Sequence, residues 1–186
     1  VLMMLNVHAH AAAPDCVATL ANTPQGLAIE HDGLALPVSL ACPELTVGDQ
    51  NVGGQGPLGS APVDLSSGAP VELAYEPIAL AGGGRLQVSL YLQWSAQEKV
   101  LRKWARLRLA EDASARLLEE VVLEELAADE RSFDVLSEGV QSYPAYTDGF
   151  FAGIEYPIAA TRLVTDDAGR RLLLARDRAG KKPLYY

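Results

Sequence analysis

Residues 86–94 constrain the fold of this chain more strongly than any other segment. Apolar residues occupy its even-numbered positions and more polar ones its odd-numbered positions: Leu86, Val88, Leu90 and Leu92 alternate with Gln87, Ser89, Tyr91 and Gln93. Residues two apart lie on the same face of an extended strand, so this period predicts a strand with one buried face. The chain is therefore expected to build a β-sheet.

Turn chemistry predicts hairpins on either side of this strand. Residues 26–29 and 34–36 flank Asp32-Gly33, and glycine readily adopts the positive φ of a tight turn. Residues 161–165 and 170–175 flank the sequence DDAG, whose composition is typical of turns.

The segment that precedes residues 86–94 is expected to contain a loop and a second strand. Residues 48–70 hold many Gly and Pro and show no periodicity, so we expect a loop there. Residues 71–80 are expected to form a strand that pairs with 86–94 across AGGG.

Local sequence favours helices over residues 97–130. The stretches EKVLRKWARLRLA and SARLLEEVVLEELAADE are rich in strong helix formers, and apolar residues of the second fall at helical spacing. Against this, Val100, Trp104 and Val121-Val122 are residue types that favour strands. The residues alone leave both interpretations open.

Length and charge limit the classes of function. The chain has 186 residues, 49% of them hydrophobic, which suits one globular domain. Its net charge is −9, from 24 acidic and 15 basic residues, which disfavours nucleic acid or an anionic membrane as a partner. No apolar stretch reaches the roughly 20 residues of a membrane-spanning helix.

The N-terminal residues have two interpretations. VLMMLNVHAHAAA pairs an apolar run with small residues that fit a signal-peptide cleavage site, although a basic start is absent. We expect residues 1–15 to be the remnant of a signal peptide and 16–186 to form one secreted or periplasmic domain; the alternative is an apolar first strand. Export would permit a Cys16–Cys42 disulfide, and the alternative is two buried thiols.

The sequence lacks a recognisable catalytic motif. Residues 54–59, GQGPLG, match the dinucleotide pattern G-x-G-x-x-G, but Pro57 removes a backbone amide and Pro62 interrupts the helix that this site requires. The His residues are His8, His10 and His31, without metal-ligand spacing nearby, and Gly-x-Ser-x-Gly is absent. We therefore expect no cofactor, no metal and no catalytic residues in this chain.

The stretch SYPAYTDGFFAGIEYPIA, residues 142–159, concentrates aromatic rings and carboxylates. Aromatic faces stack on the C–H faces of sugars while carboxylates accept hydrogen bonds from hydroxyl groups. The alternative is a core strand with inward rings and outward acids. The candidates for carbohydrate contact are Tyr143, Tyr146, Asp148, Phe151, Glu155 and Tyr156.

Two stretches resemble the N-terminal β-sandwich domain of bacterial glycoside hydrolases of the α-galactosidase (melibiase) type. Residues 86–126 are similar to that family's "vlRkW" strand and the strand after it, and residues 143–159 to its "yPvf-dgfFwGlEyPia" strand pair. The resemblance implies a mostly-β fold, an antiparallel supersandwich similar to galactose mutarotase, with residues 97–130 as strands. Such a sandwich precedes a catalytic (β/α)₈ barrel, which would lie outside these residues.

Three functions follow as expectations. The first is a non-catalytic sandwich domain of a glycoside hydrolase that supports the substrate cleft or assembly. The second is a free-standing carbohydrate-binding module, and the third is a structural or interaction β-sandwich. Galactose mutarotase acts through His and Glu, and because no His follows His31, epimerase activity is not expected.

Overall fold

Strands are the regular elements in the part of the chain that the structure describes. This computed structural model describes residues 2–9, 18–23, 26–31, 33–59, 62–110, 116–127, 134–135, 145–147, 150–154, 159–166, 169–176 and 182–184. Within these ranges no helix occurs, so none is present there that could cross a membrane. All pairings between the described strands are antiparallel. The prediction of a mostly-β, antiparallel fold is confirmed.

The largest sheet has eight strands and carries the long strand that the sequence predicted. Its order is β12-β13-β14-β1-β10-β9-β7, and β8 also pairs with β9. The bounds are β1 Leu2–Ala9, β7 Val71–Ala74, β8 Ile78–Ala79, β9 Arg85–Ser95, β10 Val100–Leu109, β12 Asp134–Val135, β13 Ala145–Thr147 and β14 Phe150–Ile154.

Two smaller sheets complete the described fold. One has six strands in the order β15-β16-β11-β5-β6, with β17 also paired to β11, and the other has the order β2-β3-β4. Their bounds are β2 Ala18–Thr23, β3 Gly26–His31, β4 Leu34–Ser39, β5 Glu44–Val47, β6 Gln50–Val52, β11 Arg116–Ala127, β15 Ala159–Asp166, β16 Gly169–Arg176 and β17 Lys182–Leu184.

Both hairpins predicted from turn chemistry are confirmed. Strands β3 and β4 pair so that His31 lies opposite Leu34, and Gly33 between them has φ +76°, a conformation that favours glycine. Strands β15 and β16 pair from Ala159 to Asp166, which lies opposite Gly169. In both cases a short polar turn follows directly from the local sequence.

The helical interpretation of residues 97–130 is wrong, because β10 and β11 are strands. Strand β10 pairs with β9 over ten residues, from Val100 opposite Ser95 to Leu109 opposite Leu86. Every second residue of β10 from Leu101 onward is buried. A helix would spread these residues around its circumference, whereas a strand places them all on the inner face. Tertiary burial thus overrides local helix propensity.

The region from 48 to 80 is only partly as expected. Residues 50–52, expected as loop, form β6, which pairs with β5 through a turn at Gly48-Asp49. The expected strand 71–80 is interrupted by residues 75–77, which leaves β7 and β8 as two short partners of β9. At this interruption Tyr75 is buried, and its hydroxyl donates to the backbone carbonyl oxygen of Leu40 at 2.7 Å.

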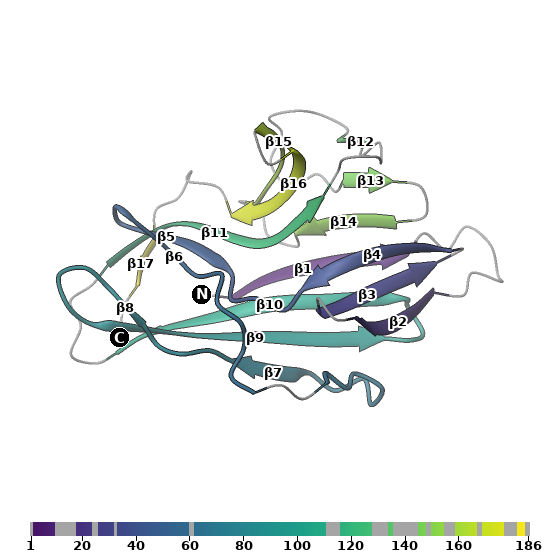
Figure 1. Cartoon of the computed structure of the whole chain (residues 1–186), viewed down its shortest axis with the longest axis horizontal. Coiled ribbons are helices and arrows are strands. Elements are labelled where there is room, and N and C mark those ends of the chain that lie inside the picture. The colour runs from purple at the N-terminus through teal and green to yellow at the C-terminus, as the bar shows by residue number, and fades with distance from the viewer. Residues whose placement is uncertain are drawn as a thin grey trace.

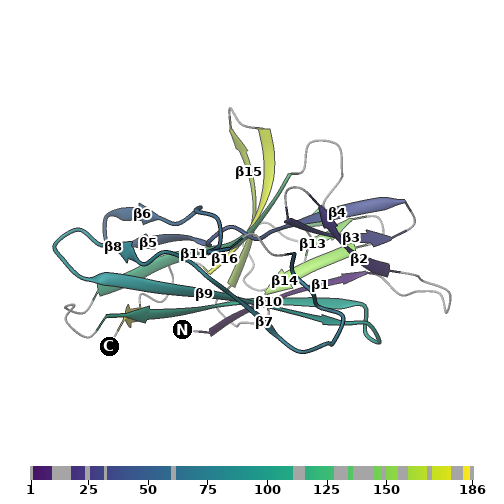
Figure 2. The same ribbon diagram turned by 60° about the horizontal axis from the view of Figure 1, so that its bottom comes forward.

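The three sheets share one hydrophobic core. Figure 2 shows β9, β10 and β1 in one layer, with β5, β6 and the β2–β4 sheet above it, and the β15–β16 hairpin pointing away from the layers. Figure 1 shows β11 next to β16, with which it pairs. The buried cluster draws on all three sheets and includes Leu27, Ile29, Leu36, Leu45, Leu86, Leu90, Leu92, Leu101, Leu118 and Val121.

The N-terminal residues belong to the largest sheet. Strand β1 lies between β10 and β14, with Leu5 opposite both Lys103 and Ile154. This is the alternative that the sequence left open, an apolar first strand. A signal-peptide role for residues 1–15 and export of the chain stay predictions.

Candidate functional site

The aromatic stretch predicted to contact carbohydrate is described in part. Tyr146 in β13 lies directly opposite Phe151 in β14, so the strand register puts them on the same face of the sheet. Tyr143, Asp148, Glu155 and Tyr156 lie outside the described residues. The proposed sugar contacts of all six residues therefore stay predictions.

Of the two cysteines, the structure describes Cys42. Within the described residues Cys42 forms no disulfide, and only 2% of the residue is exposed. Cys16 lies outside the described residues, so the predicted Cys16–Cys42 disulfide stays a prediction. Burial raises the pKa of the Cys42 thiol from an ordinary 9.0 to about 11. At neutral pH this thiol is protonated and therefore a poor nucleophile.

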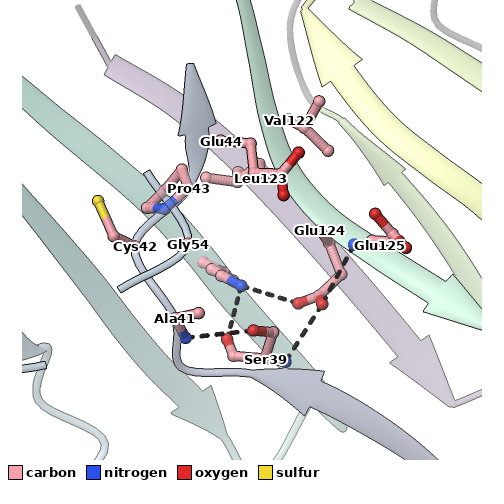
Figure 3. Close-up of a pocket in the computed structure, with 11 residues that line it drawn as sticks. Ser39, Ala41, Cys42, Pro43, Glu44, Gly54, Val122, Leu123, Glu124 and Glu125 are labelled. Carbon is pink, nitrogen blue, oxygen red and sulfur yellow. Dashed lines mark hydrogen bonds and ion pairs between the residues drawn. The ribbon is translucent and has the colours of Figure 1, made fainter. Parts of the chain in front are cut away.

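A pocket of about 320 Å³ lies where the three sheets meet (Figure 3). Its walls come from the end of β4, from the connection between β4 and β5, and from residues 122–125 of β11. Strand β10 contributes one residue, Lys103, at the floor of the pocket. The side chains and backbone that line it belong to Ser39, Ala41, Cys42, Pro43, Glu44, Gly54, Lys103, Val122, Leu123, Glu124 and Glu125. It is larger than a second pocket of about 170 Å³, which is lined by Glu44, Asn51, Val52 and Gly53.

Lys103 reaches this pocket because of its position in β10. It shares the inner face of the strand with Leu101, Ala105 and Leu107, and it is only 1% exposed. A lysine in an inner row is uncommon, because a buried ammonium must be paired to offset its lost hydration. The alternation in the sequence therefore contained a signal for this site that the sequence interpretation missed.

Glu124 is turned toward Lys103 by an irregularity in β11. Along β16, Val122 lies opposite Ala175 and Glu124 opposite the next residue, Leu174, so Leu123 is an extra residue of a β-bulge. Leu123 and Glu124 are consequently both buried, although they are adjacent in the strand. Without the bulge, Glu124 would share the orientation of Val122, which is only half-buried.

The buried ion pair ties the three sheets together. The Lys103 ammonium donates to Glu124 Oε2 at 2.8 Å and to the Ser39 carbonyl oxygen at 2.7 Å. Glu124 Oε1 accepts from the backbone N–H groups of Ser39 at 3.2 Å and Glu125 at 3.3 Å. Both ionic side chains are 1% exposed, so solvent screening of this contact is weak.

The groups around the pair limit what the pocket can do chemically. Lys103 and Glu124 are held against each other, and the Ser39 hydroxyl oxygen accepts from the Ala41 N–H at 3.1 Å. In Figure 3 the Cys42 sulfur points away from the ion pair. Among the described residues no group of three His, Cys, Asp or Glu is arranged to hold a metal ion. The arrangement suits binding better than acid–base catalysis.

The dinucleotide-like segment 54–59 has no nucleotide-binding architecture around it. Contrary to expectation a strand, β6, does precede it, but the described residues 62–70 that follow it contain no helix. Instead, the backbone N–H of Gly54 donates to the carbonyl oxygen of Cys42 at 2.9 Å, and the backbone N–H of Cys42 donates to the carbonyl oxygen of Gln55 at 2.8 Å. Of this segment, Gly54 lines the pocket.

One pair of aromatic residues lies on the opposite face of the sheet. Tyr91 in β9 and Trp104 in β10 are direct cross-strand neighbours, and their rings stack with centroids 5.4 Å apart and planes 10° apart. Both residues are half-buried. The sequence did not indicate this pair, because it depends on the register between two strands.

Compared with known proteins, the chain matches no family model, no curated protein and no solved structure. What the chain does must therefore be argued from its own residues.

Proposed function

We propose that this chain is a non-catalytic β-sandwich domain of a glycoside hydrolase of the α-galactosidase type, exported with its catalytic barrel. Its role in this proposal is to support the substrate cleft or the assembly of the enzyme. The chain would then contribute binding surface and shape, and the barrel would contribute the catalytic carboxylates.

One observation carries the proposal, which is that residues 100–109 and 116–127 are strands although their local sequence favours helices. The resemblance to glycosidase sandwich domains requires strands here, and β9, β10 and β11 run through this segment. The paired rows of apolar residues on β9 and β10 give the strands a common buried face.

The chemistry of the pocket fits an accessory role. Glycoside hydrolysis requires two carboxyl groups about 5–10 Å apart that are free to exchange protons with the substrate. In the pocket the buried carboxylate, Glu124, is bound to Lys103 and to two backbone N–H groups. These bonds hold the Glu124 carboxylate in one position against Lys103 and the backbone.

The parent reading frame tests this proposal directly. We expect a segment of about 250 residues with alternating strand and helix patterns after Tyr186. The isolated chain should not hydrolyse a nitrophenyl α-galactoside, and the protein with the barrel should. A reading frame without such a segment, or hydrolysis by the isolated chain, would contradict the proposal.

A second candidate, a carbohydrate-binding module, is favoured by the register of β13 and β14. Tyr146 lies directly opposite Phe151 in this register, and stacking of aromatic rings on a sugar is the proposed mode of contact. A glycan array with wild type, Tyr146→Ala and Phe151→Ala tests it, and Leu58→Ala, at an exposed apolar residue, is the matched control. Binding that both aromatic variants lose and the control keeps would support the module; no binding would exclude it.

A further inference from the structure

The buried ion pair has hydrogen-bonding capacity that the described residues leave unfilled. A lysine ammonium carries three N–H donors, and Lys103 uses two of them, on Ser39 and Glu124. A carboxylate offers about four lone-pair positions, and Glu124 uses three. Within the described part of the chain, no further partner contacts either group. One donor and one acceptor are therefore left side by side.

Both unfilled positions belong to groups that line the pocket. Lys103 and Glu124 line the pocket together with the turn that follows β4 and the bulge of β11, and this pair is called the floor of the pocket. Figure 3 shows Glu124 next to Ser39 at the end of β4. Each is 1% exposed, so bulk water does not reach them freely. A buried donor left without a partner costs about 1–3 kcal/mol, and more when it is charged. The pair therefore favours a bound molecule that accepts a hydrogen bond from Lys103 and donates one to Glu124.

A hydroxyl group is the chemical group that fits such a floor. Its oxygen accepts from the ammonium while its hydrogen is donated to the carboxylate. A bare anion would meet the carboxylate of Glu124 and those of Glu44 and Glu125 in the walls, and a metal cation would meet the ammonium. The mixed signs at the floor thus disfavour ions of either charge and favour a neutral hydroxylated molecule.

The size of the pocket calls for more than one hydroxyl group. Its volume of about 320 Å³ is room for about ten water molecules at roughly 30 Å³ each. It also lies at the lower end of the range of small-molecule sites, about 300–1,000 Å³. Glu44 in the wall is an exposed carboxylate that can accept from a further hydroxyl group. A single sugar ring has the size and the hydroxyl groups to match.

We propose that this pocket binds a neutral polyhydroxylated molecule of the size of one sugar ring, with one of its hydroxyl groups held between Lys103 and Glu124. The choice of a sugar over another polyol rests on the proposed function. The binding site itself rests on the residues at the sheet junction. It is separate from the aromatic stretch that the sequence indicated.

Titration of the ¹⁵N-labelled full chain with D-galactose, D-glucose and myo-inositol tests the site. We expect at least one of these probes to shift the backbone amide signals of Ser39, Ala41 and Glu125 in a saturable way. Ala41→Leu adds bulk in the pocket wall and leaves the ion pair intact, and it should weaken this binding at least tenfold. Ala79→Leu makes the same change at an exposed position of β8 and should leave the affinity unchanged.

Several results would overturn the proposal. The first is the absence of saturable shifts with all three probes, which would mean that water alone occupies the pocket. The second is equal affinity of a probe for wild type and Ala41→Leu. If Ala41→Leu does not fold, Glu44→Gln at the exposed wall replaces it, with an expected loss of threefold or more, and unchanged affinity would overturn the site. A missing catalytic barrel in the parent protein would sink the proposed function but leave these binding results intact.

Discussion

The inner face of the eight-stranded sheet has an apolar region under β9 and a polar junction at Lys103, and the two contribute differently to the fold. Under β9, Leu86, Leu90 and Leu92 are completely buried among other aliphatic side chains. At the junction, an ion pair and two backbone groups of Ser39 meet with defined donors and acceptors.

The contrast between the apolar region and the polar junction indicates which interactions fix the arrangement of the sheets. Burial of aliphatic groups is non-directional and tolerates small shifts, at about 25 cal/mol per Å² of apolar area. Hydrogen bonds to charged groups require one geometry, and an unpaired buried charge is costly. We infer that the apolar region supplies most of the stability, and that the junction selects one placement of β4, β10 and β11.

The largest effect is expected when one partner of the ion pair is removed. Lys103→Met leaves the Glu124 carboxylate buried without its cation and should lower the free energy of unfolding by about 3–5 kcal/mol. Urea unfolding measures it. Lys103→Met combined with Glu124→Leu removes both charges and should cost no more than about 2 kcal/mol, from the groups of Ser39 left unpaired. Equal losses in the single and double variants would contradict this account.

Much of the fold could be predicted from local sequence, because local turn chemistry and period-2 alternation need no tertiary context. The β3–β4 and β15–β16 hairpins and strand β9 belong to this class. Strands β10 and β11 do not, since their Leu, Arg, Lys and Glu residues are good helix formers. Only the resemblance, which treats the segment as part of a larger sheet, predicted them as strands.

The candidate site was beyond local reasoning for a different reason. Lys103 lies in the apolar row of β10, which the alternation could have revealed once the segment was taken as a strand. Glu124 could not be assigned in this way, because simple alternation from Val121 and Leu123 places it on the outer face. The bulge at Leu123 reverses that orientation, and a bulge depends on the pairing with β16.

A substitution in the apolar region should cost less than the loss of Lys103 and should depend on volume alone. Leu90→Ala leaves a cavity in the core and should lower the free energy of unfolding by about 3 kcal/mol, whereas Leu90→Met should cost under about 1.5 kcal/mol. Ser89→Ala, at the half-buried neighbouring position on the other face, is the control and should stay within about 0.5 kcal/mol. If Leu90→Met costs as much as Leu90→Ala, packing here is as specific as at the junction.

The Cys42 thiol should make stability depend on pH in the alkaline range. Its pKa is about 11 in the folded chain and 9.0 ordinarily, so between these values the unfolded chain loses a proton that the folded chain keeps. Stability therefore falls as pH rises from 9 to 11, by about 2 kcal/mol in total from this group. Subtracting the pH profile of Cys42→Ala from that of wild type isolates this part, and parallel profiles would show that the thiol does not contribute.

The smallest expected effect concerns the face of the sheet that points away from both regions. Tyr91 and Trp104 stack across β9 and β10, and a stacked pair contributes about 0.5–1.5 kcal/mol beyond its buried area. A double-mutant cycle with alanine at both positions should give a coupling energy in this range. The cycle at Ser89 and Arg106, the directly paired residues beside them, supplies the background and should give almost none. A Tyr91–Trp104 coupling energy as large as the decrease in the free energy of unfolding of Lys103→Met would mean that contacts on the outer face also select the placement of the strands. The junction would then not differ from the rest of the sheet in this respect.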